Sequence, residues 1–239
     1  MRQLINQRVL ISKVKMQQIQ KNKRAIFALV FMLTLFGARL VYADTALSAD
    51  LEARYDTLKS WQADFNQTTH VEILNQKLKK QGFIAVARPN KIHISYHNPA
   101  KTYVSNGKKL WIYKDDKTAL QFNKPKKIIS KEALSFLSGL QNLSKLFDVK
   151  KTEKNSTQKL GFNNKKLSHL DLIPKDDLSA VIKITLGIDS KEHIVKEAIL
   201  YNVSGNITHY EFNKLAFDLN LDPTLFTLPG KKKRKIIRR

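Results

Sequence analysis

The sequence contains no cysteine among its 239 residues, and only 8 glycines and 6 prolines. The absence of cysteine excludes disulfide bonds, a cysteine nucleophile, thiolate metal sites and attachment of a lipid to an N-terminal cysteine. The sequence also has no glycine-rich phosphate-binding loop and no Gly-x-Ser-x-Gly motif, so we do not expect an enzyme. With 42% hydrophobic residues, the composition is that of a globular protein with its own core.

Positive charge is concentrated at both ends of the chain. Residues 1–43 hold 8 basic and no acidic residues, and residues 231–239 hold 7 basic and no acidic residues, which leaves +8 of the formal +23 for residues 44–230. A basic chain favours an anionic partner, either a nucleic acid or a membrane surface. Aromatic residues do not accompany the basic tail, so we expect no nucleic-acid partner. We expect the tail to be disordered and to make a transient contact with anionic membranes.

The N-terminal segment is typical of an export signal. Basic residues at positions 21–24 precede the apolar run Ala25–Phe36, which at about a dozen residues is short for a membrane-spanning helix of about 20. Residues that a signal peptidase tolerates follow and end at Ala43. We therefore predict a signal peptide over residues 1–43, beginning at Met1 or Met16, and a periplasmic mature protein; an uncleaved anchor is the alternative.

Hydrophobic periodicity predicts a mainly β protein with two helices. Alternation at Trp61–Phe65 and at Ile92–Tyr96 is typical of strands, and Asn106-Gly107 is a strong hairpin signal. The predicted strands cover residues 61–65, 82–87, 92–96, 103–105, 110–113, 119–122, 167–173, 181–188, 194–201 and 207–217. Apolar residues at spacings of three and four predict helices over residues 47–58 and 131–147.

A long antiparallel meander of this kind curls, and its concave face needs a cover. The two predicted helices are the available covers. We therefore expect one domain over residues 44–230, an incomplete (half) antiparallel β-barrel closed by an α-helical lid. The pattern alone leaves open whether the space between sheet and lid is a packed core or a hydrophobic cavity.

Histidines and carboxylates form no pattern that indicates a metal or catalytic site. His93 and His97 lie on one predicted strand, about 13 Å apart at ~3.3 Å per residue, which is too far for one ion. The remaining histidines are isolated in the sequence, and we expect them at the surface: His70, His169, His193 and His209. We predict no metal and no cofactor.

Seven short motifs follow one another along the chain. They are Ser60-Trp-Gln-Ala-Asp-Phe-Asn-Gln67, Gly82-Phe-Ile-Ala-Val-Ala-Arg-Pro-Asn90, Tyr96-His-Asn-Pro99, Val104-Ser-Asn-Gly-Lys-Lys-Leu-Trp-Ile-Tyr113, Leu170-Asp-Leu-Ile-Pro-Lys175, Ser204-Gly-Asn206 and Phe226-Thr-Leu-Pro229. In this order and spacing the chain resembles the LolA family of periplasmic outer-membrane lipoprotein carriers, from Asp44 to Gly230.

The resemblance implies a half-barrel whose hydrophobic cavity shields the acyl chains of lipoproteins. It implies loading from an inner-membrane lipoprotein-releasing ABC transporter and delivery to an outer-membrane lipoprotein receptor. It also implies that the arginine of the Arg-Pro motif, Arg88, ties the lid shut when the cavity is empty. The residues expected to line the cavity and lid are Ile84, Val86, Ile92, Ile94, Tyr96, Leu134, Phe136, Leu137, Leu140 and Leu143.

Two further interpretations concern identity and assembly. The family's receptor has a similar fold but is itself a lipoprotein, and a chain without cysteine cannot be that receptor. A periplasmic lipid-binding sensor or regulator on the same half-barrel is the alternative function, although such proteins usually carry a second domain. We expect the carrier to be a monomer.

Overall fold

The computed structural model describes residues 42–123, 143–153, 166–176, 180–230 and 234–238. The chain divides into two units, residues 1–45 and residues 46–239, and the β-sheet belongs to the second. The predicted signal peptide, apart from Tyr42 and Ala43, lies outside the described residues. Among the described residues, no helix combines the length and apolar character that crossing a bilayer requires.

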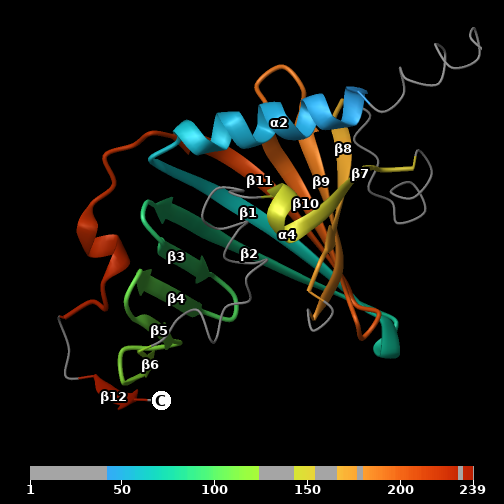
Figure 1. The fold of residues 1–239 in the computed structure, drawn as a ribbon. Helices are drawn as coiled ribbons and strands as arrows, with labels where there is room; N and C mark the ends of the chain where they lie inside the picture. The colour runs from blue at the N-terminus through green and yellow to red at the C-terminus, as the bar shows by residue number, and fades with distance from the viewer. Residues whose placement is uncertain (1–41, 124–142, 154–165, 177–179, 231–233, 239) are drawn as a thin grey trace, which may run out of the picture. The chain divides into compact units, whose positions relative to one another are not determined.

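A single sheet of 12 strands dominates the fold (Figure 1). Its strands are β1 (Ser60–Val71), β2 (Gln76–Ala87), β3 (Lys91–Tyr96), β4 (Lys101–Asn106), β5 (Leu110–Tyr113), β6 (Thr118–Phe122), β7 (Phe147–Lys151), β8 (Ser168–Pro174), β9 (Val181–Asp189), β10 (Ile194–Asn202), β11 (Ile207–Phe217) and β12 (Lys235–Arg238). Their order is β12-β6-β5-β4-β3-β2-β1-β11-β10-β9-β8-β7, so β12 and β7 are the two edges and the sheet does not close. The predicted half-barrel is confirmed.

Neighbouring strands are antiparallel throughout, except that β12 runs parallel to β6. Each predicted strand is present within a few residues, and Gly107 takes a positive φ of 86° in the predicted hairpin turn between β4 and β5. The sequence did not predict the first half of β2, Gln76–Gln81, because lysine and glutamine give it no apolar alternation.

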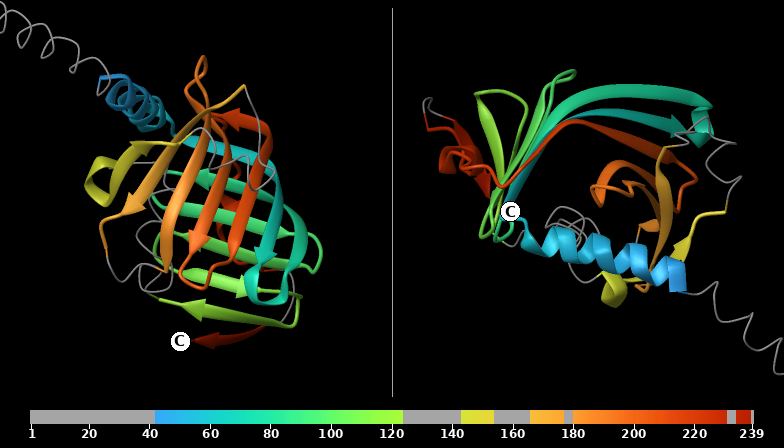
Figure 2. Two further views of the ribbon diagram at one scale, coloured as in Figure 1. Left: turned by 90° about the vertical axis from the view of Figure 1, so that its right-hand side faces the viewer. Right: turned by 90° about the horizontal axis from the view of Figure 1, so that it is seen from above.

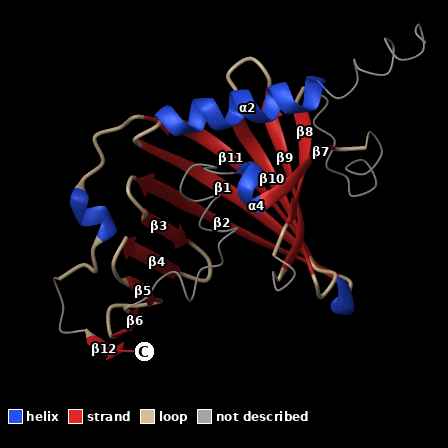
Figure 3. Ribbon diagram, viewed as in Figure 1, coloured by secondary structure: helices blue, strands red, loops and turns tan. Residues whose placement is uncertain are grey.

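Two α-helices and two 3-10 helices complete the described part of the chain (Figure 3). They are α2 (Tyr42–Thr57), α4 (Leu143–Leu146), η1 (Glu72–Leu74) and η4 (Pro223–Phe226). The first predicted helix is present but begins already at Tyr42. The second was predicted over residues 131–147, of which residues 131–142 lie outside the described residues. Its predicted end is wrong at Phe147, which begins β7 and pairs with Pro174 of β8.

The main hydrophobic core lies on the concave side of the sheet, where α2 crosses the strand ends (Figure 2). Leu51 and Tyr55 of α2, and Leu58 directly after it, pack against the sheet, each no more than 4% exposed. The sheet supplies Trp61, Ala63, Phe65, Ile84, Val86, Phe147, Leu170, Leu172, Ile184, Leu186, Ile188, Val195, Ala198 and Phe212. We call this concave side the inner face and the convex side the outer face.

The outer face of β3 and β4 is covered by the segment that follows β11. Phe226 of η4 is 2% exposed, and the main-chain oxygen of Leu225 lies 2.7 Å from His93 Nδ1. Asp222 caps η4 by accepting a hydrogen bond from the Thr224 amide at 2.8 Å. The Asp222-Pro223 turn therefore closes the domain over the outer face.

The basic tail departs from expectation, because part of it is ordered. Lys235–Arg238 forms β12 and pairs with β6, the strand edge that would otherwise be free. Arg234 fixes the segment: its Nη2 lies 2.6 Å from Asp116 Oδ1, and its guanidinium stacks 4.5 Å from the Tyr113 ring centroid. The prediction of a disordered tail is therefore wrong for residues 234–238, because an unpaired strand edge and an acidic turn provide partners.

Candidate functional site

The inner face of the sheet is built by strict alternation along β1, β2 and β3. In antiparallel strands, directly opposed residues project to the same face. Ala63 opposes Ile84, which opposes Ile94, and the neighbouring row joins Trp61, Val86 and Ile92. The five sheet residues predicted as cavity lining (Ile84, Val86, Ile92, Ile94 and Tyr96) therefore share one face, and Ile84, Val86 and Ile92 are at most 4% exposed.

A row of aromatic rings runs across this face from β4 to β11. Tyr96 lies between Tyr103, at 6.3 Å between ring centroids, and Phe65, at 5.3 Å. Phe65 continues to Tyr210 at 5.8 Å, and Tyr210 stacks on Phe212 at 6.4 Å with an interplanar angle of 7°. Offset and edge-on rings at these separations attract one another beyond their burial. Sequence reasoning identified only Tyr96 as a site residue; the alternating Trp61-x-Ala63-x-Phe65 and Tyr210-x-Phe212 were the signals for the others.

Gly82 makes room for this row. It opposes Phe65 on β1 and Tyr96 on β3, in the middle of the inner face. A Cβ atom at Gly82 would lie 2.5 Å from Phe65 Cζ and would also collide with the main-chain oxygen of Ser95. The glycine therefore lets the Phe65 ring lie directly over the β2 backbone.

The hydroxyls of Tyr96 and Tyr210 on this face are uncharged at neutral pH. Burial raises the pKa of Tyr210 well above its ordinary value, and the neighbouring Tyr96 raises it further. Burial also raises the pKa of Tyr96, against the lowering effect of its hydrogen bond with Tyr210. The row thus offers an apolar surface with a few hydroxyls, and two lysine ammonium groups lie over its rings, Lys80 Nζ 5.6 Å from the Tyr96 centroid and Lys101 Nζ 4.7 Å from the Tyr103 centroid.

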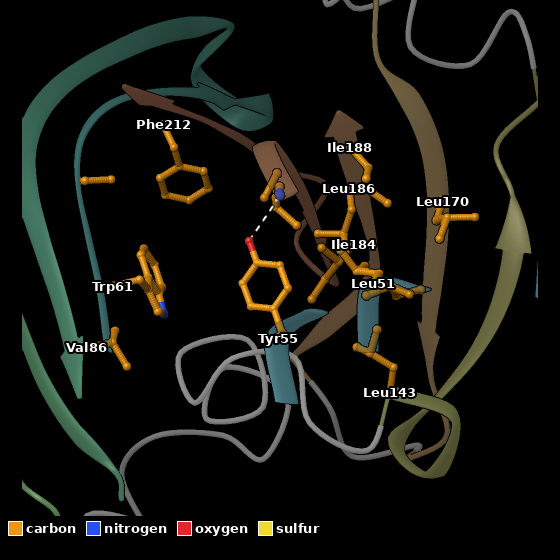
Figure 4. Close-up of a cluster of buried hydrophobic side chains, with 14 of the residues drawn as sticks. Leu51, Tyr55, Trp61, Val86, Leu143, Leu170, Ile184, Leu186, Ile188 and Phe212 are labelled. Carbon is orange, nitrogen blue, oxygen red and sulfur yellow. Dashed lines mark hydrogen bonds between the residues drawn. The ribbon is translucent and has the colours of Figure 1, made fainter. Parts of the chain in front are cut away.

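Helix α2 is attached to the inner face through Tyr55 (Figure 4). The Tyr55 hydroxyl accepts a hydrogen bond from the Val195 amide at 3.1 Å. That amide is available because the β9–β10 register shifts between Val195 and Glu197. Burial raises the pKa of Tyr55 to about 12. In Figure 4 the ring stands between Trp61 and Val86 on one side and Ile184 and Leu186 on the other.

Arg88 lies at the C-terminal end of α2, next to the end of β2. Its Nη2 donates to the main-chain oxygen of Tyr55 at 2.7 Å, and its Nη1 donates to that of Asp56 at 2.8 Å. Both oxygens belong to the last helical turn, and that of Tyr55 also accepts a hydrogen bond from the Leu58 amide at 3.2 Å. The Asp56 carboxylate is 3.9 Å from Nη2. Arg88 therefore binds the N-terminal helix, α2, at its C-terminal end.

Of the five lid residues predicted on residues 131–147, only Leu143 is described. It is fully buried, on α4, and belongs to the same core cluster as Leu51 of α2. The Ser144 amide donates to Glu52 Oε1 at 3.1 Å, which joins α4 to α2. Leu134, Phe136, Leu137 and Leu140 lie outside the described residues, so the complete cavity stays a prediction.

The inner face becomes polar toward the strand ends farthest from α2. Thr69 Oγ1 and Thr208 Oγ1 lie 3.1 Å apart across β1 and β11, and Gln67 Nε2 donates to Thr69 Oγ1 at 3.0 Å. A pocket of about 370 Å³ opens beside them, lined by Ala180, Val181, Leu200, Asn202, Val203, Ser204 and Thr208. The inner face thus runs from a dry, apolar end under α2 to a polar, open end.

A buried charged cluster occupies the outer face of β8, β10 and β11. Glu197, 5% exposed, accepts from His169 Nε2 at 2.8 Å and from His209 Nε2 at 3.1 Å. Burial by itself would raise the pKa of Glu197, but these two hydrogen bonds and the charge of the histidines outweigh it and lower the pKa to about 2. The expectation that His169 and His209 lie at the surface is therefore wrong: the sheet register brings them to one carboxylate.

Within the described ranges, no group of three or more histidine, aspartate or glutamate side chains is arranged so that it could hold a metal ion. His93 is engaged with Leu225 under η4, and His97 is exposed at the end of β3. The organised features of the site are therefore an apolar aromatic face, a helix that covers one end of it, and an arginine bound to that helix.

Comparison with known proteins gives a consistent assignment. The family model described as outer membrane lipoprotein carrier protein LolA matches residues 56–229. Curated relatives are named outer-membrane lipoprotein carrier protein. The one from Chromobacterium violaceum is 25% identical over 77% of this chain and 84% of its own length. The one from Francisella tularensis subsp. novicida is 26% identical over 90% of this chain and 97% of its own length.

Solved structures with a similar fold include a LolA-superfamily protein from Nitrosomonas europaea, with 10% identity, a TM-score of 0.42, and coverage of 77% of this chain and 97% of that one. The lipoprotein LppX of Mycobacterium tuberculosis has 15% identity and a TM-score of 0.42, with coverage of 75% of this chain and 99% of that one.

Proposed function

Since the chain belongs to the LolA family of outer-membrane lipoprotein carrier proteins, we propose that it carries lipoproteins across the periplasm with their acyl chains held against the inner face of the sheet. The observation that carries this proposal is the apolar face that runs from Trp61 through Phe65 to Tyr96 on adjoining strands.

Burial of an acyl chain in a membrane is favourable by about 0.8 kcal/mol per CH₂, and two such chains already anchor a protein firmly. A lipoprotein therefore leaves the membrane only if another apolar surface receives its acyl chains. A carrier must replace the bilayer for those chains and still release them. The proposed acyl-binding residues are Ile84, Val86, Ile92, Ile94, Tyr96 and Leu143, with the aromatic row, and with Leu134, Phe136, Leu137 and Leu140 outside the described part of the chain.

Arg88 is the proposed latch of the empty carrier. Its two hydrogen bonds to the Tyr55 and Asp56 carbonyls hold α2 against the sheet. Acyl chains that enter between α2 and the inner face displace the helix and break these bonds. Their re-formation then favours release of the cargo.

The rest of the pathway follows from the same proposal. The mature protein works as a periplasmic monomer after removal of residues 1–43. It receives lipoproteins from an inner-membrane ABC transporter and passes them to an outer-membrane receptor. No covalent step is involved, because cargo is bound and released without a chemical change.

Two neighbouring residues on β3 provide a matched test. Ile94 lies on the inner face opposite Ile84, and Ser95 lies on the other face opposite Phe83. Ile94→Asp places a carboxylate where acyl chains are proposed to bind, whereas Ser95→Asp places it on the outer face. We expect Ile94→Asp to bind a fluorescent triacylated lipopeptide at least about tenfold more weakly, and Ser95→Asp to bind it within about twofold of the unmodified protein.

Lipid extraction and native mass spectrometry of the purified protein complete the test. Acylated species bound to the unmodified protein and lost in Ile94→Asp support the proposal. Equal lipopeptide binding by both variants, with both still folded by circular dichroism, overturns the assignment of the inner face as the acyl site.

A further inference from the structure

Exposed aliphatic side chains gather at one end of the sheet, formed by η1 and the turn between β10 and β11. We call this end the tip and define it as residues 72–75 and 203–206. Ile73 is 87% exposed, Leu74 61% and Val203 68%. The Glu72 amide donates to Asn206 Oδ1 at 3.0 Å, so the two turns are joined side by side (Figure 1).

Both turns are held in place by their own hydrogen bonds. Asn202 Oδ1 accepts from the amides of Ser204, at 3.1 Å, and Asn206, at 3.0 Å. Asn75 ends η1 in the left-handed region with its amide bonded to the Glu72 oxygen. The exposure of Ile73, Leu74 and Val203 is thus a feature of the folded backbone. Isolated exposed apolar residues are common, but three neighbouring ones on a projecting end indicate a contact surface.

The surroundings of the tip are basic. Lys77 and Lys79 are exposed on β2 and oppose His70 and Thr68 of β1. Glu72 is the single carboxylate among residues 68–81, and its Oε2 lies 3.4 Å from His70 Nε2. The β10–β11 turn carries no charged residue between positions 202 and 208. Cationic side chains therefore flank the aliphatic ones.

The tip is far from the site under α2. Strand β1 begins at Ser60, beside the C-terminal end of α2, and ends at Val71, beside the tip. Its 12 residues extend roughly 36 Å at ~3.3 Å per residue. A surface bound at the tip would therefore leave Arg88 and α2 free to move.

We propose that the tip docks on anionic lipid bilayers, with Ile73, Leu74 and Val203 entering the interfacial layer and Lys77 and Lys79 near lipid phosphates. A projecting aliphatic end of this kind fits the interfacial layer of a bilayer. It also lacks the tryptophan, tyrosine and arginine that dominate protein–protein contacts. The lysines match the negative potential of anionic lipids. This contact is separate from the proposed acyl site.

Insertion can be measured with a tryptophan placed on the tip. Trp61 and Trp111 are 6% and 8% exposed, so their emission provides a constant background. The protein is expressed as the full chain and purified as the cell processes it. In Ile73→Trp, we expect the added indole to shift its emission to shorter wavelength, and to be quenched by brominated acyl chains, on vesicles of phosphatidylcholine with phosphatidylglycerol. The control Ile236→Trp, at an exposed position on β12 that opposes Ala119 on the outer face, should show neither effect.

Binding of vesicles gives the second measurement. Leu74→Asp should weaken binding by about tenfold relative to Ile236→Asp, because the burial of two methylene groups in the bilayer already supplies that factor. Lys79→Gln should weaken it by about fivefold, and Lys109→Gln, in the β4–β5 turn, should not. Lipopeptide binding should be unchanged in these variants.

Three results would overturn the proposal. The first is an added indole at position 73 that stays in water on anionic vesicles. The second is equal vesicle binding by Leu74→Asp and Ile236→Asp. The third is tip variants that bind vesicles normally but lose cargo transfer to membranes that contain receptor protein, which would assign the tip to a protein partner. Loss of lipopeptide binding in Ile94→Asp has no bearing on these outcomes.

Discussion

The guanidinium of Arg88 and the main-chain oxygen of Tyr55 are joined by a hydrogen bond of 2.7 Å between the end of β2 and the end of α2. On the opposite wall of the sheet, the Tyr55 hydroxyl accepts from the Val195 amide at 3.1 Å. Tyr55 is thus held from β2 and from β10 at once. Any movement of α2 away from the sheet must break both contacts. The two hydrogen bonds can therefore serve as separate probes of helix opening.

Arg88→Leu should tighten cargo binding. Hydrogen bonds from a charged group are worth ~1.5–3 kcal/mol, and under the proposed function they exist only in the empty state, so affinity should rise roughly 10- to 150-fold. Titration with fluorescent lipopeptide measures this, and transfer to acceptor membranes should slow in parallel. Arg88→Lys should raise cargo affinity less than Arg88→Leu. A lysine ammonium can still donate to a carbonyl oxygen, but it lacks the planar guanidinium that donates to two oxygens at once. Weaker cargo binding by Arg88→Leu would show that Arg88 contacts cargo instead.

Tyr55→Phe should destabilise the fold by about 1–3 kcal/mol, because it leaves the buried Val195 amide without an acceptor. Tyr201→Phe is the matched control, since the buried Tyr201 hydroxyl has no hydrogen-bond partner and its removal should change stability little. Urea unfolding of both variants gives the comparison. A similar loss in both would mean that the Val195 bond does not stabilise α2 on the sheet.

Gly187→Ala should destabilise the protein by about 1–3 kcal/mol through overpacking. Its Cβ would lie 2.6 Å from Glu197 Oε1 and closer still to Cγ, on a residue already fixed by two histidines. Gly230→Ala is the control, because nothing lies within 4 Å of a Cβ there. Thermal unfolding should separate the two variants, and an unchanged midpoint for Gly187→Ala would contradict the close packing of Glu197.

Glu197→Gln should flatten the dependence of stability on acid pH. The pKa of Glu197 is about 2 in the fold and 4.5 ordinarily, so the carboxylate stabilises the fold above pH 4.5 and this stabilisation is lost as the pH falls toward 2. The loss amounts to about 3 kcal/mol between roughly pH 5 and pH 2. Urea unfolding across that range gives the free energy of unfolding at each pH. Its slope against pH should be steeper for the unmodified protein than for Glu197→Gln, and equal slopes would contradict the shifted pKa.

Sequence pattern alone was sufficient to predict the elements in which one face is apolar. Trp61-x-Ala63-x-Phe65 and Ile92-x-Ile94-x-Tyr96 predict strands, and their shared face follows once both are placed in one curled sheet. Family membership, inferred from seven motifs, is confirmed by the match over residues 56–229. Arg88 was expected to bind free carbonyls at a helix end, but pattern alone could not select α2 over the second predicted helix.

Other features depend on strand register or on contacts between residues far apart in the sequence, and no local sequence pattern predicts them. His169, Glu197 and His209 are well separated in the sequence, and only the pairing of β8 to β11 brings them together. Strand β12 forms because β6 offers a free edge and Asp116 binds Arg234, neither of which shows in a run of basic residues. Phe147 continues an apolar helical spacing, yet its pairing with Pro174 places it in a strand.

The position of β1 in the sheet also bears on the order in which the protein folds. Strands β2 to β6, and likewise β7 to β10, pair with neighbours in the chain, and such local contacts form early. The seam between the two halves joins Trp61 to Phe217, near opposite ends of the described chain. Closing that seam carries the largest loop-entropy cost in the sheet, so we expect it to be the slowest step of folding. A nascent chain therefore has no complete inner face until β11 has emerged, and under the proposed function a partly translocated molecule cannot capture cargo prematurely.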